Sequence, residues 1–160
     1  LGLARLVGIR LPENFDRPYL RTNLTAFWNS WHITLAQWFR AYFFNPLTRA
    51  LRSRPERLPA WLIILAGQLG GMALIGLWHG ITWNFLIWGV WHGLGLFAHN
   101  RWSGWVRPRL PDLSTAPFLS RLLAVGGWAA TFNYVALGWV WFALPTPALA
   151  LAFLRRLLGV

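Results

Sequence analysis

Histidine is the residue type in this chain that is best placed to do chemistry, and His79 is the clearest case. It lies in segment 76–80, which reads Gly-Leu-Trp-His-Gly, and no Lys, Arg, Asp or Glu occurs between Leu58 and Ala98. A helix of about 20 apolar residues already crosses a bilayer. Ionisable groups at that depth are costly and usually face a polar cavity or a partner, so His79 is a candidate functional residue.

A buried histidine can also be purely structural, with one ring nitrogen satisfied by a backbone carbonyl. Neighbouring residues favour a function here. Gly80 can end the helix or let a ligand approach the backbone. Asn84 and His92 add polar groups nearby in the sequence, and His32 lies in a second unusual motif upstream. His99 is a weaker candidate that we expect to be solvated or interfacial.

Acid–base chemistry on a neutral substrate is the reaction class that these histidines favour. Desolvation disfavours a charged imidazole in a bilayer, so the ring stays neutral and able to accept a proton. It could then act as general base toward a substrate hydroxyl. No Gly-x-Ser-x-Gly motif and no serine lies close to His79, so a Ser–His triad is not indicated. A hydroxyl supplied by the substrate would explain the missing nucleophile.

Metal and haem chemistry are the alternatives. A zinc site commonly needs three or four ligands, but the chain has no cysteine, no His-x-x-x-His pair and only four acidic residues, all in loop-like segments. We therefore expect no metal and no bound cofactor. A bis-histidine haem protein stays open as an alternative, because His79 and His92 are separated by about 20 Å along a continuous helix. Haem ligands usually come from facing helices, which argues against it.

The composition is that of a multi-span membrane protein. The 160 residues are 56% hydrophobic and 12% charged, with 13 Trp and 11 Phe. The net charge of +11 comes from arginines gathered between apolar runs, at 49–57 and 101–109. This positive-inside pattern predicts that both segments are cytoplasmic loops. Nucleic-acid binding is not predicted, because it would need a basic face on a soluble fold.

The apolar runs predict an all-α, polytopic fold with transmembrane helices at 60–78, 83–98 and 122–144, and a loop at 102–117. Glycines four residues apart in the first two spans predict close helix–helix contact. Because the chain starts and ends within apolar stretches, we expect a single membrane domain, 1–160, that is the C-terminal fragment of a larger protein.

Residues 24–44 predict one amphipathic helix that Pro46 closes. Its apolar residues recur at steps of three and four, and Asn29, His32 and Arg40 share a polar stripe. The stripe is too polar to face lipid all round, so the helix is expected to be re-entrant or interfacial. In the re-entrant case, these three side chains line a reaction tunnel.

The motifs resemble those of a known family. Segment 27–35 reads Phe-Trp-Asn-Ser-Trp-His-Ile-Thr-Leu, followed by Trp-Phe-Arg at 38–40 and Pro-Leu at 46–47. This is similar to a signature of the membrane-bound O-acyltransferase family. Segment 76–80, with His92-Gly93, resembles that family's active-site region. Segment 14–19 resembles the segment that precedes this signature in one bacterial branch of the family, the alginate O-acetyltransferases and teichoic-acid D-alanyl transferases.

The resemblance implies that His79 is the catalytic histidine and His32 the second motif histidine. It also implies a tunnel that brings an acyl donor, either acyl-CoA or an acyl carrier, and an alcohol together from opposite membrane faces. The chain departs from the alginate type in having Arg-Ala-Tyr at 40–42, where Arg-Asp-Tyr is usual, which leaves the donor and the subfamily open. We expect the following residues to contact substrate: Asn29, Arg40, Trp78, Asn84 and His92.

The function predicted is a multi-pass plasma-membrane O-acyltransferase. It would move an acyl group, expected to be acetyl, onto a hydroxyl of an exported or cell-envelope polysaccharide. Its expected partners are membrane lipid, the polymer acceptor, and a carrier protein or a periplasmic or extracellular acyl-transfer protein. The competing interpretation is a non-catalytic transport or export component that uses the same polar tunnel to pass substrate.

Overall fold

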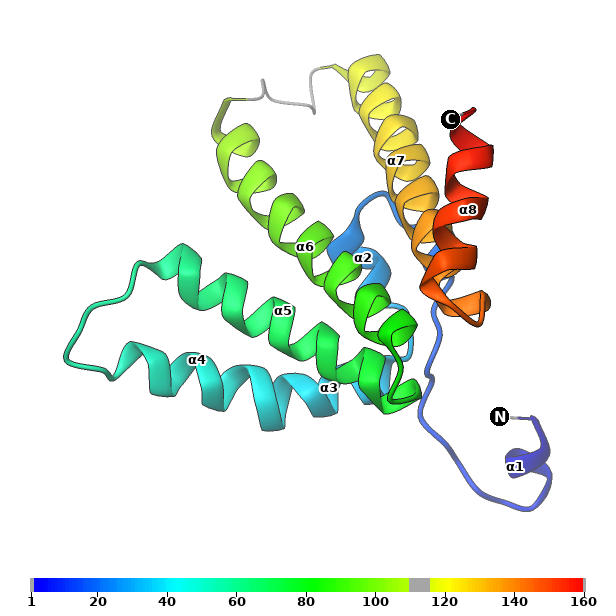
Figure 1. Ribbon diagram of the computed structural model, residues 1–160, viewed down its shortest axis with the longest axis horizontal. Helices are drawn as coiled ribbons and strands as arrows, with labels where there is room; N and C mark the ends of the chain where they lie inside the picture. Colours follow the sequence, from blue (N-terminus) through cyan, green and yellow to red (C-terminus); the bar gives the residue numbers. More distant parts are fainter. Residues whose placement is uncertain (1, 110–115, 160) are drawn as a thin grey trace.

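The computed structural model describes residues 2–109 and 116–159, which form helices and connecting segments without any strand (Figure 1). The predicted all-α class is confirmed. In chain order the elements are α1 (Gly2–Leu6), the 3-10 turn η1 (Pro18–Leu20), α2 (Leu24–Trp28), α3 (Ile33–Phe39), the π-helical turn η2 (Arg40–Phe44), α4 (Asn45–Arg52), α5 (Ala60–His79), α6 (Trp83–Val106), the 3-10 turn η3 (Arg107–Arg109), α7 (Pro117–Ala143) and α8 (Pro147–Leu158).

The hairpin of α5 and α6 is the most closely packed pair in the molecule. At its tightest point two glycines bring the backbones together. A Cβ on Gly89 would lie 2.9 Å from the Cα of Ala73, and one on Gly76 would collide with the carbonyl oxygen of Phe85. Since real Cβ atoms do not approach so closely, a side chain at either position would force the helices apart. The glycine spacing predicted this contact.

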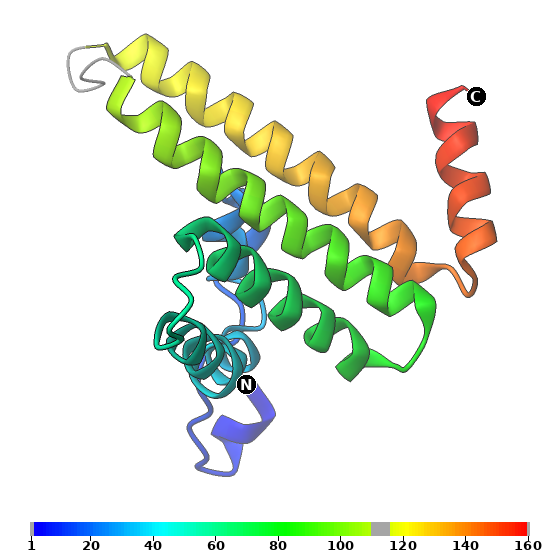
Figure 2. The ribbon, with the colours of Figure 1, turned by 60° about the vertical axis from the view of Figure 1, so that its left-hand side comes forward.

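Helix α7 runs beside α6 on the side away from α5, and α8 turns back and diverges from that pair (Figure 2). Two aromatic side chains join α6 to α7 through backbone carbonyls. Trp91 Nε1 donates to the carbonyl of Tyr134 (3.1 Å), and the Tyr134 hydroxyl donates to the carbonyl of Trp91 (2.5 Å). The rings also stack, with centroids 4.8 Å apart. These reciprocal bonds fix the register of α7 against α6.

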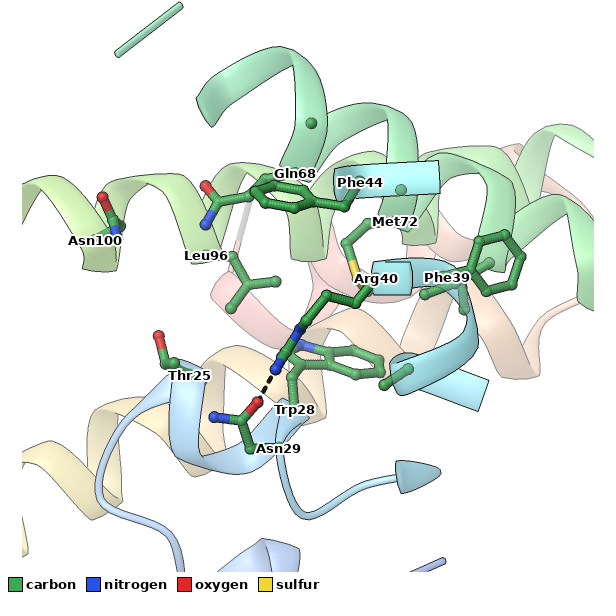
Figure 3. Close-up of a pocket in the computed structure, with 14 residues that line it drawn as sticks. Thr25, Trp28, Asn29, Phe39, Arg40, Phe44, Gln68, Met72, Leu96 and Asn100 are labelled. Atoms are coloured by element: carbon green, nitrogen blue, oxygen red, sulfur yellow. Dashed lines mark hydrogen bonds between the residues drawn. The ribbon is translucent and has the colours of Figure 1, made fainter. Parts of the chain in front are cut away.

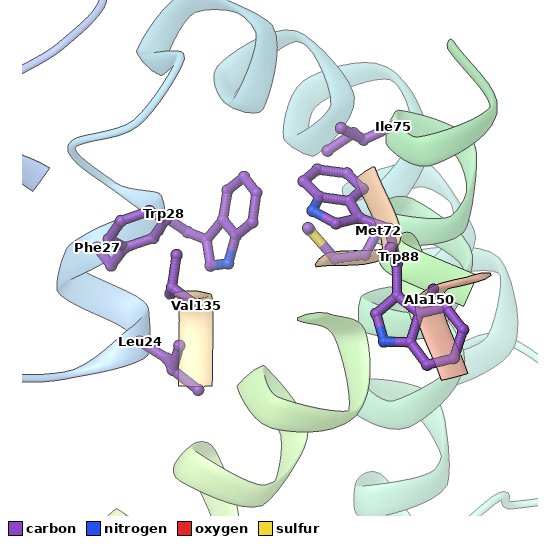
Figure 4. Close-up of a cluster of buried hydrophobic side chains, with 9 residues drawn as sticks. Leu24, Phe27, Trp28, Met72, Ile75, Trp88, Val135 and Ala150 are labelled. Carbon is purple, nitrogen blue, oxygen red and sulfur yellow. The ribbon is translucent and has the colours of Figure 1, made fainter. Parts of the chain in front are cut away.

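One apolar cluster joins α2, α5, α6, α7 and α8 (Figure 4). Helix α2 supplies three of its side chains, and Trp88 of α6 is among the most buried, with 1% of its surface exposed. The buried members are Leu24, Phe27, Trp28, Met72, Ile75, Trp88, Val135, Trp141 and Ala150. Short α2 is therefore held against the long helices by its aromatic residues, which brings the segment that follows it close to α5.

The prediction of one helix over 24–44 is wrong, because the chain turns sharply after α2. His32 adopts a left-handed backbone conformation (φ 45°, ψ 52°), which no α-helix contains. Asn14 stabilises the turn: its carbonyl accepts from the N–H of Ile33 (2.9 Å), and its Oδ1 accepts from the N–H of Thr34 (3.0 Å). A contact from a distant loop thus overrides the local helical pattern.

Pro46 does not close the helix as predicted. A proline inside a regular α-helix clashes with the carbonyl four residues earlier. Here the chain passes through a π-helical turn over Arg40–Phe44, in which the N–H of Asn45 bonds the carbonyl of Arg40, and then continues as α4. The wider turn accommodates the proline near the start of α4.

The long helices extend beyond the predicted boundaries. Helix α6 continues to Val106, so the loop predicted from 102 is wrong over its first residues, and residues 110–115 of that loop lie outside the described part. Helix α7 begins at Pro117, since proline suits the first turn of a helix. By length and composition α5 and α7 could cross a membrane, with mean hydropathies of 1.9 and 1.2. Helix α6, which carries the polar residues Asn84 and His92, is not counted among the helices that are apolar enough to cross a membrane.

The glycine contact between α5 and α6 predicts the effect of a single methyl group. In the full-length protein, Gly89→Ala should lower the free energy of unfolding by about 1–3 kcal/mol, the usual cost of overpacking. Melting in detergent measures the change. Gly104→Ala on the same helix is the matched control, because its Cβ would meet nothing within 4 Å and alanine favours the helix. Equal melting temperatures for the two variants would contradict the proposed backbone contact.

Candidate functional site

His79 is the last residue of α5, and its half-buried imidazole lies among aromatic rings from two other helices. Trp88 of α6 and Phe142 of α7 meet it edge to face, with centroids 5.6 and 4.9 Å away. The helix ends directly after it at Gly80, where a Cβ would lie 2.6 Å from the ring of Phe85. The imidazole is therefore fixed by packing at the end of a helix, in apolar surroundings.

His32 reaches the same place from the turn between α2 and α3. His32 directly precedes α3, but its side chain makes no capping hydrogen bond to that helix. Asn14 accepts the hydrogen bonds from the first N–H groups of α3 instead. The imidazole packs edge to face on Trp78, with centroids 5.9 Å apart. Its Nδ1 is buried and has no hydrogen-bond partner among the described residues. A left-handed backbone conformation at a non-glycine residue such as His32 costs about 1–3 kcal/mol, and residues in such conformations cluster at functional sites.

The two histidines line one small cavity, which we call the histidine cavity. Its other lining residues are apolar: Trp28, Trp31, Leu35, Ala36, Ile75 and Trp88. The cavity volume is about 10 Å³, which is close to the minimum that holds one water molecule. A neutral imidazole here could accept a proton from a bound hydroxyl, while the indole walls exclude bulk water from the reacting atoms.

A larger, open cavity lies next to it and shares Trp28, Ala36 and Ile75 with it. We call it the arginine cavity, because Arg40 lines it (Figure 3). Its volume is about 190 Å³. Arg40 Nη2 donates to Asn29 Oδ1 across it (2.7 Å). Asn29 and Arg40 thus lie together as predicted, although α2 and the π-helical turn bring them there, not one helical stripe.

His32, which was predicted to share that stripe, lines the histidine cavity instead. Trp78 lies beside both cavity histidines: its ring meets His79 at 4.9 Å, while 57% of the residue is exposed. Asn84 lines neither cavity. It is buried, and its Nδ2 donates to the carbonyl of Leu144 at the end of α7 (2.5 Å). In the structure Asn84 ties two helices together, and its predicted contact with substrate stays a prediction.

His92 also lines neither of these cavities. It is fully buried, and its Nδ1 donates to the carbonyl of Trp88 (2.9 Å). Rings from three helices surround it, at centroid distances of 5.2 Å for Trp28, 4.8 Å for Trp88 and 6.2 Å for Tyr134. A haem could ligate it only by displacing these rings. Among the described residues, no group of three or more His, Cys, Asp or Glu side chains could hold a metal ion.

Sequence reasoning missed two residues that shape the site. Asn14 holds the turn that presents His32, and it stands in a segment whose resemblance to the family could have drawn attention to it. Phe142 packs on His79 from α7, and nothing in the sequence indicates that contact. His99, expected near a loop, lies within α6, where its Nδ1 hydrogen-bonds the hydroxyl of Thr25 (3.0 Å).

Because His92 is tightly packed, we expect its replacement by alanine to lower the free energy of unfolding. Replacing this fully buried side chain by alanine leaves a cavity, which typically costs about 2–5 kcal/mol. In the full-length protein, melting in detergent should therefore show a larger loss for His92→Ala than for His79→Ala, because His79 is only half-buried. A melting temperature unchanged by His92→Ala would contradict the structural role.

Comparison with known proteins agrees with the motifs. Residues 2–138 match the model of the membrane-bound O-acyltransferase family. The chain is 32% identical over 161 aligned positions to a peptidoglycan O-acetyltransferase of Helicobacter pylori, covering 100% of this chain and 27% of the relative. It is 36% identical over 144 positions to a protein of Azotobacter vinelandii named probable alginate O-acetylase, covering 89% of this chain and 25% of the relative.

A teichoic acid D-alanyltransferase of Streptococcus thermophilus is 34% identical over 102 positions, covering 64% of this chain and 25% of that protein. The chain thus spans about a quarter of the length of these curated relatives. The resemblance inferred from the two histidine motifs is confirmed. The chain belongs to the membrane-bound O-acyltransferase family.

Proposed function

We propose that this chain is the part of a multi-pass plasma-membrane enzyme that carries its acyl-transfer site. The enzyme transfers an acetyl group to a hydroxyl of an exported or cell-envelope polysaccharide. The observation that supports this most directly is the histidine cavity, where His32 and His79, from motifs far apart in sequence, meet between indole walls. Two of the relatives described above are named peptidoglycan O-acetyltransferase and probable alginate O-acetylase, which favours acetyl over D-alanyl.

His79 acts as general base in the proposed reaction. Its neutral imidazole takes the proton from the acceptor hydroxyl as the hydroxyl oxygen attacks the carbonyl carbon of an acyl thioester. The carbon–sulfur bond breaks, and the imidazolium returns the proton to the leaving thiolate. The products are the ester on the polymer and a free thiol. The two substrates supply nucleophile and leaving group, so the protein needs no nucleophilic serine or cysteine.

His32 has the second role in the site. Its imidazole lines the same cavity and its Nδ1 has no partner among the described residues, so it can hydrogen-bond a water or the acyl carbonyl. The acyl donor is either acyl-CoA or an acyl group on a carrier protein. A periplasmic or extracellular acyl-transfer protein is the alternative partner of the enzyme.

Loss of the His79 imidazole is the direct test of this proposal. In the full-length enzyme, His79→Ala should lower polymer acetylation by about 10²–10⁴-fold, the usual worth of a general base. Acetyl content of the purified polymer measures it at matched protein levels. His32→Asn should cause a smaller loss, since asparagine tolerates left-handed backbone and keeps a hydrogen-bonding group.

His99→Ala is the matched control, because His99 lines neither cavity, and it should leave acetylation unchanged. Retention of more than about a tenth of the activity by His79→Ala would reject the general-base role. Polymer that reaches the cell surface unmodified in wild-type cells, but fails to be exported by the His79 variant, would favour a transport component instead.

The arrangement of α5 and α6 gives a second test. The two helices are antiparallel, so the start of α5 and the end of α6 lie at the same end of the hairpin (Figures 1 and 2). The arginine-rich segments beside these ends favour a cytoplasmic location for both. In a cysteine-free version of the full-length protein, Ser53→Cys and Ser103→Cys should resist an impermeant thiol reagent in intact cells and react after lysis. Labelling of either residue from outside would contradict this orientation.

A further inference from the structure

We propose that Asn14 and Phe15 are positioning residues for the acyl transfer, which act by holding His32 in place. The inference rests on the proposed function and gives a role in the reaction to a loop that lines neither the histidine cavity nor the arginine cavity. Asn14 would fix the backbone of His32, and Phe15 would fix its ring.

The imidazole of His32 has few bonds of its own to hold it. An imidazole that acts in a reaction is often oriented by a hydrogen bond from its Nδ1 to a backbone carbonyl or a carboxylate. The Nδ1 of His32 is buried and has no such partner among the described residues. The ring therefore depends on the backbone that carries it and on the rings that pack against it.

Asn14 caps α3 in place of the residue that precedes this helix. That residue usually accepts a hydrogen bond from the first N–H groups of the helix through its own side chain. At α3 the Oδ1 of Asn14 accepts instead from the N–H (3.0 Å) and the hydroxyl (2.6 Å) of Thr34, while its carbonyl accepts from the N–H of Ile33 (2.9 Å). These bonds hold His32 in its left-handed conformation (φ 45°) and leave its imidazole free to reach the cavity.

Phe15 contacts the imidazole that this backbone presents. The two ring centroids are 5.9 Å apart, which is within the range of favourable aromatic pairs. Phe15 also meets Trp31 edge to face, with centroids 5.0 Å apart, and Trp31 lines the histidine cavity. Because Trp78 packs on the imidazole as well, His32 has one aromatic neighbour from the loop and another from α5.

The loop is anchored on α7, the helix that also contacts His79. The Nε1 of Trp128 donates to the carbonyl of Tyr19 (2.8 Å), and Phe142 of the same helix packs on His79. Both histidines are thus positioned relative to α7, one through the loop and the other through a direct ring contact. A shift of the loop would therefore change the position of His32 relative to His79.

Matched substitutions at Asn14 in the full-length enzyme test this role. Asn14→Leu removes the acceptor at similar size and should lower the rate of polymer acetylation by about 10- to 100-fold, because a misplacement of about 1 Å can cost about 100-fold. Asn14→Asp keeps an acceptor oxygen for both donors of Thr34 and should retain most of the rate. Acetyl content of the polymer against time in cells, at matched protein levels, measures the rate.

Substitutions at Phe15 and Thr34 test the contacts one at a time. Phe15→Leu removes the ring and should lower the rate several-fold, whereas Phe15→Tyr keeps the ring at this half-exposed position and should retain the rate. Thr34→Val removes only the hydroxyl that donates to Asn14, so it should also lower the rate, while Thr34→Ser should not. Glu13→Gln is the matched control from the same loop and should change nothing, because its ion pair with Arg5 is exposed and such pairs contribute little.

A comparison of double variants separates positioning from support of the fold. In the His32→Asn background, Asn14→Leu and Phe15→Leu should have no further effect on the rate, since the effects of residues that act through one group are not additive. Equal fractional losses with and without the His32 imidazole would mean that the loop only supports the fold, and would overturn the inference.

Other results would also contradict the inference. An unchanged rate in both Asn14→Leu and Phe15→Leu, or an equal loss in Asn14→Asp and Asn14→Leu, would exclude positioning by these contacts and leave the proposed function standing. If Asn14→Leu fails to accumulate, equal rates for Thr34→Val and Thr34→Ser would contradict the role of Asn14. Acetylation that does not need His79 would contradict the proposed function itself.

Discussion

The contact between the backbones of α5 and α6 is the constraint on which the rest of the structure depends. At Gly76 and Gly89 a Cβ would collide with the backbone of the facing helix, so the two backbones are in direct contact there. The close contact sets the height of Trp88 on α6 relative to His79 on α5. Trp88 in turn contacts His79, Trp28 and His92. The position of this one indole, which the hairpin sets, therefore determines how the side chains around the histidine cavity pack.

The second constraint is the turn at His32, which must be assembled from parts that are not adjacent in sequence. Asn14 accepts hydrogen bonds from the backbone N–H groups of Ile33 and Thr34, which a continuous helix would otherwise satisfy. The aromatic residues of α2 anchor the turn in the apolar cluster. The strained backbone of His32 is therefore maintained by contacts on both sides. Without them, the local sequence would continue as a helix and direct the imidazole elsewhere.

These two constraints explain what the sequence could predict. Long apolar runs and glycine spacing depend on local composition, so the helices near 60–78, 83–98 and 122–144 were found, with errors at their ends. The break after α2 was missed, because residues 24–44 have a helical pattern and the competing bonds come from Asn14. The pairing of His32 with His79 was suggested by motifs that resemble a family, whereas Phe142 and the roles of Asn84 and His92 depend on how α7 packs, which no local pattern encodes.

The separation of the two cavities follows from the different costs of burying a neutral and a charged group. A neutral imidazole can lie between indoles at modest cost, and the dry surroundings strengthen each hydrogen bond that it makes to a reacting hydroxyl. A guanidinium in the same place would pay a large desolvation penalty. Arg40 instead lines the open cavity, where solvent or an anion can compensate its charge, while Trp28 and Ile75 separate it from the histidines. The fold thus keeps the charged side chain of Arg40 apart from the two histidines, while the cavities that they line remain neighbours.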